Sequence, residues 1–62
     1  MTKTEAKTLA ATAHKNLMDR LANADARELA LEWTQEEAAT KREEAHVQYM
    51  HTLDNITVLV AA

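Results

Sequence analysis

The residues of this chain best suited to chemistry are the carboxylate of Glu43 and the imidazole of His46. On a helix, Glu-x-x-His spacing places both groups on one side, as in the di-iron proteins of the ferritin-like class. Such a site needs further carboxylates from other helices, and Glu5 is the candidate that an early turn would bring near Glu43. Both glutamates lie off the apolar stripes of their helices. The pattern therefore favours solvated side chains, and we expect no metal and no cofactor.

Catalysis by a side-chain nucleophile is not expected. The chain contains neither cysteine nor serine, which removes the usual nucleophiles of catalytic triads. It also lacks glycine, so a Gly-rich phosphate loop is excluded. The three histidines, His14, His46 and His51, are expected on the surface. We therefore predict that this protein is not an enzyme.

The apolar content points to a partner chain. Of 62 residues, 47% are apolar, which is 29 residues, and 13 of these are alanine. The remaining 16 large apolar side chains are few for a stable core, and chains of this size usually need a disulfide, a metal or a partner. Without cysteine a disulfide is impossible. Self-association, as a homodimer or higher oligomer, is the expected solution.

Charge and hydropathy restrict the other partners. The net charge of -3 argues against broad nucleic-acid binding. An acidic band at Glu36, Glu37, Glu43 and Glu44 is expected to be a solvated face. The sequence shows no signal peptide and no apolar run near 18 residues, so we expect a cytoplasmic protein without a membrane partner.

The elements that position these residues are expected to be helices. Glycine and proline are absent, and strong helix formers dominate, which predicts a single all-α domain over residues 1–62. A first helix is expected from about 3 to 22, with Thr2 and Glu5 at capping-box spacing. Its apolar residues recur at helical spacing; they are Ala6, Leu9, Ala10, Ala13, Leu17, Leu21 and Ala24.

The turn is expected at residues 23–25. Asn23 can end a helix in the left-handed conformation, and Asp25 with Glu28 can cap the next one. The second helix would run from about 26 to 60, with a possible kink near residue 34, where Thr34 and Glu37 form another capping signal. Residues 56–60 are rich in β-branched side chains and could be a short strand. We favour helix because the chain offers no strand to pair with them.

This plan gives an antiparallel hairpin with a short first helix and a long second helix, which dimerises into a bundle. The second helix carries two apolar stripes, and its end, from Tyr49 to Val60, would overhang the first helix. One stripe would pack on the first helix and the other on a second chain. The predicted interface residues are Leu29, Trp33, Val47, Tyr49, Met50, Leu53, Ile56, Val58 and Val60.

The opening residues 1–5, the two-helix plan and the chain length resemble the Rop family of plasmid copy-number proteins. That resemblance implies a hairpin that dimerises into a four-helix bundle and binds paired RNA loops. Lys3 matches a basic RNA-contacting position, whereas His14 stands where the family has an aromatic residue. The expected turn comes earlier than in the family, and the family's cysteines are missing.

The leading hypothesis is a small self-associating helical module that binds a larger protein. By analogy with other short helical chains, a phage or mobile-element inhibitor or adaptor is the expected type. Two alternatives remain open. One is a Rop-like RNA-binding regulator, and the other is a ferritin-like metal-binding hairpin dimer.

Overall fold

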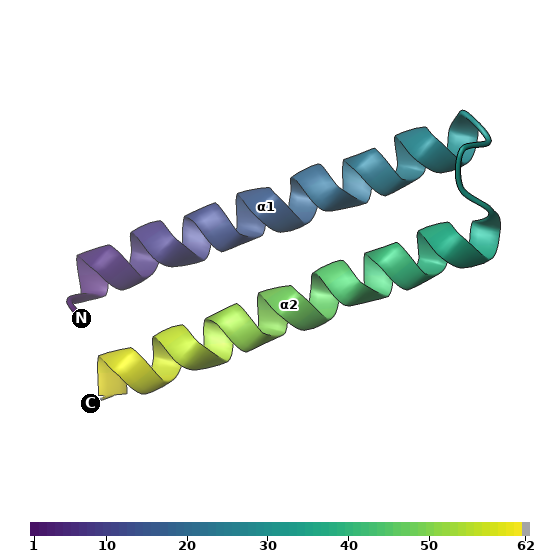
Figure 1. Ribbon diagram of the computed structural model, residues 1–62. Coiled ribbons are helices and arrows are strands. Elements are labelled where there is room, and N and C mark those ends of the chain that lie inside the picture. The colour runs from purple at the N-terminus through teal and green to yellow at the C-terminus, as the bar shows by residue number, and fades with distance from the viewer. Residues whose placement is uncertain (62) are drawn as a thin grey trace.

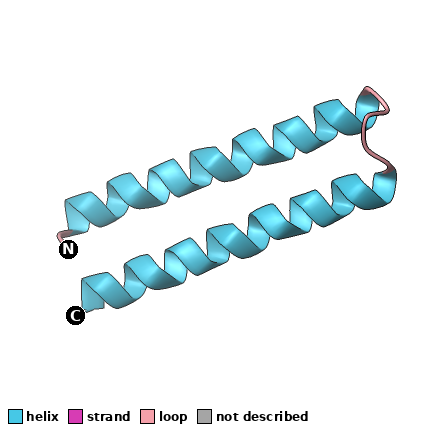
Figure 2. Cartoon of the chain, in the orientation of Figure 1, coloured by secondary structure: helices cyan, strands magenta, loops and turns pink. Residues whose placement is uncertain are grey.

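The computed structural model describes residues 1–61, which form two antiparallel α-helices joined by a short turn (Figures 1 and 2). Helix α1 spans Lys3–Leu29 and α2 spans Gln35–Ala61, and each has 27 residues. The all-α hairpin predicted from composition is thus confirmed. Its extents are 45 × 15 × 8 Å, so the chain forms a single layer of helices.

Helix α1 begins with the predicted capping box. The Thr2 hydroxyl accepts a hydrogen bond from the Glu5 backbone N–H at 3.1 Å, and the Thr2 backbone N–H donates to the Glu5 carboxylate at 3.4 Å. Two N–H groups that lack partners within the helix are thereby satisfied.

The turn predicted at residues 23–25 is wrong, because α1 continues through Asn23 and Asp25 to Leu29. An asparagine inside a helix costs less than about 1 kcal/mol, and the alternating alanines around it are the strongest helix formers. Ala24 is also 1% exposed, so the packing against α2 rewards a continuous helix at this point. The capping box predicted for Asp25 and Glu28 is therefore wrong too.

Helix α1 ends in a Schellman motif. The N–H of Leu31 donates to the Glu28 carbonyl at 3.1 Å, and that of Glu32 donates to the Arg27 carbonyl at 2.9 Å. Leu31 occupies the left-handed position with φ of 60°, which glycine normally takes. A side chain with a Cβ pays about 1–2 kcal/mol there.

Helix α2 begins at the second capping signal, which the sequence analysis interpreted as a possible kink. The Thr34 hydroxyl accepts from the Glu37 backbone N–H at 3.1 Å and donates to the Glu37 carboxylate at 3.3 Å. The interpretation as a kink is wrong because the residues before Thr34 form the turn rather than helix.

The predicted overhang is wrong as well. Because the helices are equally long, the second half of α2 lies beside the first half of α1, and both chain ends meet at one end of the hairpin (Figure 1). The prediction of a short first helix and a long second helix fails for the same reason. Residues 56–60 are helical, as we favoured. The last residue of the predicted tail, 62, lies outside the described residues.

The helix–helix seam is lined mainly by small side chains. Among residues 1–61, four are buried: Leu17, Ala24, Ala38 and Ala45. Alanine on both helices lets their backbones approach closely. Within the same residues, neither helix is long and apolar enough to cross a membrane.

Candidate functional site

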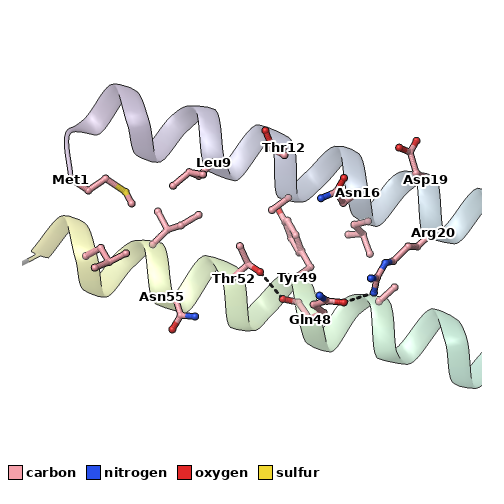
Figure 3. Close-up of a pocket in the computed structure, with 15 residues that line it drawn as sticks. Met1, Leu9, Thr12, Asn16, Asp19, Arg20, Gln48, Tyr49, Thr52 and Asn55 are labelled. Carbon is pink, nitrogen blue, oxygen red and sulfur yellow. Dashed lines mark hydrogen bonds between the residues drawn. The ribbon is translucent and has the colours of Figure 1, made fainter.

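An open groove of about 600 Å³ runs along one side of the hairpin, between α1 and α2, in the half near the chain ends (Figure 3). Its floor includes Leu17 and Ala45 from the seam, and Tyr49 lies between the two helices. We call this feature the interhelical groove. Its lining residues are Met1, Leu9, Thr12, Ala13, Asn16, Leu17, Asp19, Arg20, Ala45, Gln48, Tyr49, Thr52, Asn55, Ile56 and Leu59.

The apolar lining of the groove is concentrated toward the chain ends. Met1 and Leu9 come from the start of the chain, and Ile56 and Leu59 come from the last turns of α2. Leu9 is 44% exposed and Leu59 is 51% exposed, although both lie beside other apolar side chains. The hairpin therefore leaves an apolar concavity incompletely covered.

The other end of the groove is polar. The Arg20 guanidinium donates a hydrogen bond to the Gln48 side-chain carbonyl and so links the two helices (Figure 3). Asp19 points away from the groove and lies 3.7 Å from Lys15 on the same helix. The groove thus grades from apolar at the chain ends to polar near the middle of the hairpin.

Of the predicted interface residues, Tyr49, Leu53 and Ile56 are partly buried at the seam. These residues were expected in the overhang of the second helix, where they would contact a second chain. Tyr49 meets the His14 ring edge-on, with the ring centroids 6.1 Å apart and the planes at 66°. They contact the chain's own first helix because α1 and α2 have equal lengths.

Most of the other predicted interface residues remain exposed. Val47, Met50 and Val58 form an apolar set that we call the outer face of α2, with exposures of 50%, 56% and 66%. Val47 also lines a shallow surface depression of about 460 Å³ with Glu43 and Glu44. Val60 is 39% exposed at the end of α2. The outer face of α2 and Val60 are thus accessible to a partner.

The turn presents further apolar surface. Leu29 is 86% exposed and Leu31 is 90% exposed. Trp33, in contrast, is partly buried because the Arg27 guanidinium lies 5.2 Å from its ring centroid in a cation–π contact. Arg27 also forms an ion pair with Glu32 at 3.2 Å. These contacts hold the turn against the last turn of α1.

An ionic cluster joins the helices near the turn. Arg42 of α2 pairs with Asp25 at 2.5 Å and with Glu28 at 2.9 Å, both on α1. The hydrogen bonds that Arg42 donates to Asp25, and then to Glu28, raise the pKa of Arg42 above its ordinary value. The cluster therefore holds a charged guanidinium between two carboxylates and defines the register of the helices.

The candidate metal ligands are not assembled within one chain. Glu5 lies on the chain-end side of the His14–Tyr49 contact, and Glu43 lies on the turn side. The helical rise between them places the two glutamates about 20 Å apart along the hairpin. The prediction that Glu5 lies near Glu43 is therefore wrong. Among residues 1–61 no three His, Asp or Glu side chains gather into a possible metal site.

The sequence analysis missed the groove and the ionic cluster. Leu9 was expected on the apolar face of the first helix. Its position at the edge of that face depends on how α1 and α2 are aligned, which the sequence did not show. Arg42 carried no interpretable signal, because Asp25 and Glu28 had been assigned to a helix cap. The Thr34 capping box was the sequence signal for the later turn, from which the register of the helices follows.

In comparisons with known protein families, with curated proteins and with solved structures, nothing matches this chain. The class of protein is therefore defined by its own architecture, an all-α hairpin of two equal helices. The exposed groove and the outer face of α2 are its candidate interaction surfaces.

Proposed function

We propose that this protein is a self-associating helical interaction module. The observation that carries the proposal is its accessible surface of 4839 Å². A compact monomer of 6.9 kDa is expected to expose about 4000 Å². The excess of about 800 Å² equals the share that one partner buries in a protein–protein interface of standard size.

The thinness of the hairpin supports the same proposal. Domains normally bury their cores between two packed layers of secondary structure, whereas this chain supplies one. Three of its four buried residues are alanines, which contribute little apolar area. A second helical layer would convert the exposed side of the seam into a core.

The bundle would then act by occupying the surface of a larger protein, as an inhibitor or adaptor of the kind found in phages and other mobile elements. Val47, Met50 and Val58 on the outer face of α2 support this step, because all three are apolar, exposed and on one side of the helix. Binding rather than catalysis agrees with a sequence that lacks serine and cysteine.

Light scattering coupled to size-exclusion chromatography tests the self-association. We expect a dimer mass, or a multiple of it, between about 5 and 200 µM. Circular dichroism on the same samples reports whether the chain is helical. A helical monomer over the whole range would overturn the proposal.

A Rop-like RNA-binding regulator is the second candidate, and the corrected turn favours it. The turn expected at residues 23–25 came earlier than in the Rop family. The observed turn at residues 30–34 gives two helices of equal length and removes this difference. Exposed Lys3, Lys7 and Lys15 on α1 would supply phosphate contacts. Titration with paired RNA loops at 50 and 200 mM salt separates the candidates. RNA binding through these lysines weakens steeply with salt, whereas apolar self-association does not.

A further inference from the structure

We propose that a second copy of this chain occupies the interhelical groove, around a two-fold axis parallel to the helices. Both turns then lie at one end of the dimer, and all chain ends lie at the other. This inference rests on the proposed self-association, to which it adds the surface and the orientation.

The charge of the groove favours a second copy over the other faces. Of its 15 lining residues, Asp19 and Arg20 have charged side chains, and Asp19 points away from the groove. The chain as a whole carries -3. On the side of α2 that carries Val47, the neighbours Glu43 and Glu44 would repel the same residues of a second copy. At the groove, two identical chains therefore bring together one charged side chain from each copy, Arg20, which is already hydrogen-bonded to Gln48.

The area required sets how far the two copies overlap. One side of the hairpin is 45 Å long and 15 Å wide, which is about 700 Å² in plan and close to the excess exposed area. A contact restricted to the half that contains the groove would bury about half of this area. The copies must therefore overlap along their full length.

The gradient of the groove then sets the orientation. Leu9 and Leu59 lie at the end near the chain termini, and Arg20 lies toward the middle. With full overlap, turns at opposite ends would place these leucines against the turn half of the second copy, where the buried residues Ala24 and Ala38 are small. Turns at the same end place leucines against leucines. Only the latter arrangement brings the two apolar ends of the groove together.

Leu9 and Met18 provide a matched pair for testing the surface. Both are on α1 and both are 44% exposed, but they are nine residues apart and so lie on opposite sides of the helix. We expect Leu9→Glu to weaken dimerisation about 100-fold or more, because the substitution acts in both copies. Met18→Glu should change the dissociation constant less than about 3-fold.

The variants Leu9→Ala and Met18→Ala test the same surface if the glutamate variants fail to fold as helices. Alanine is the strongest helix former, so both variants retain helix propensity. We expect about a 10-fold weakening for Leu9→Ala and little change for Met18→Ala, measured by sedimentation equilibrium. Equal dissociation constants for the two alanine variants would overturn the groove as the interface.

The orientation is tested by a spin label on Ala30→Cys, since Ala30 is exposed at the turn and the chain has no other cysteine. Turns at the same end predict a label separation of about 10–25 Å, from helix spacing in a bundle. A separation of 45 Å or more, the length of the hairpin, would overturn the parallel axis.

The outcomes for the two proposals are distinct. If the intact chain is a helical monomer, self-association itself fails. If the intact chain is a dimer that Leu9→Ala leaves unchanged, self-association stands and the groove is wrong. A substitution at Val58 that dissociates that dimer would then assign the contact to the outer face of α2.

Discussion

The guanidinium of Arg42 on α2 lies 2.9 Å from the carboxylate of Glu28 on α1, across the seam of the hairpin. Arg42 also donates to Asp25, one helical turn earlier on α1. A planar guanidinium that serves two carboxylates one turn apart holds one register of the two helices.

Arg42→Met is expected to lower the melting temperature, because Asp25 and Glu28 then face each other without a cation. The pKa of Arg42 is raised in the folded protein, so its ion pairs contribute fully to folding stability at any pH below the ordinary pKa of arginine. This contribution is lost only as the pH rises through the raised pKa. Stability should therefore not fall between pH 7 and 10 on account of this group. Lys41→Met is the control, because Lys41 pairs with Glu44 on its own exposed helix face. An equal effect of the two substitutions would argue against the register role.

Leu31→Gly is expected to stabilise the protein by about 1 kcal/mol, since glycine adopts the left-handed conformation without a Cβ clash. The side chain is 90% exposed, so little packing is lost. Leu29→Gly is the matched control, because this leucine is 86% exposed but helical, and the change should cost about 0.5–1 kcal/mol. Chemical denaturation of both variants measures the difference. Destabilisation by Leu31→Gly would contradict the Schellman geometry.

Thr34→Ala is expected to destabilise the protein by about 1 kcal/mol, because the Glu37 backbone N–H loses its acceptor. Thr34→Asp should restore most of the loss, since aspartate is an equally good cap. Thr40 is exposed and lies within α2, away from the ends of the helix. Thr40→Ala should therefore be neutral or slightly stabilising, because alanine has the higher helix propensity. If Thr34→Ala and Thr40→Ala behave alike in thermal melts, α2 does not begin at Thr34.

Ala38→Leu is expected to cost about 1–3 kcal/mol, because the Ala38 side chain is 0% exposed and a larger one would force the helices apart. Ala39→Leu adds the same atoms to an exposed position on the same helix and should be nearly neutral. Equal stabilities of the two variants in denaturant titrations would show that the helices do not approach closely at this point.

The all-α class, a capping signal at the start of the first helix and most of the apolar face that α1 turns toward α2 could be predicted from the sequence alone. These features depend on local signals, namely helix propensity, capping-box spacing and helical periodicity. Ala6, Ala10 and Ala13 were assigned to this face, and the structure places them, partly buried, on the side of α1 toward α2. The Thr34 capping box was also recognised, but its role was not.

Only the tertiary structure decided where the chain turns, and the register, the groove and the length of the overlap followed from that choice. The local preferences at Asn23 and at Leu31 differ by only about 1 kcal/mol, so neither site decides the turn alone. Packing of Ala24 in the seam and the ion pairs of Arg42 with Asp25 and Glu28 join residues distant in the chain. These contacts form only if α1 continues to Leu29, and their combined free energy outweighs the strained turn.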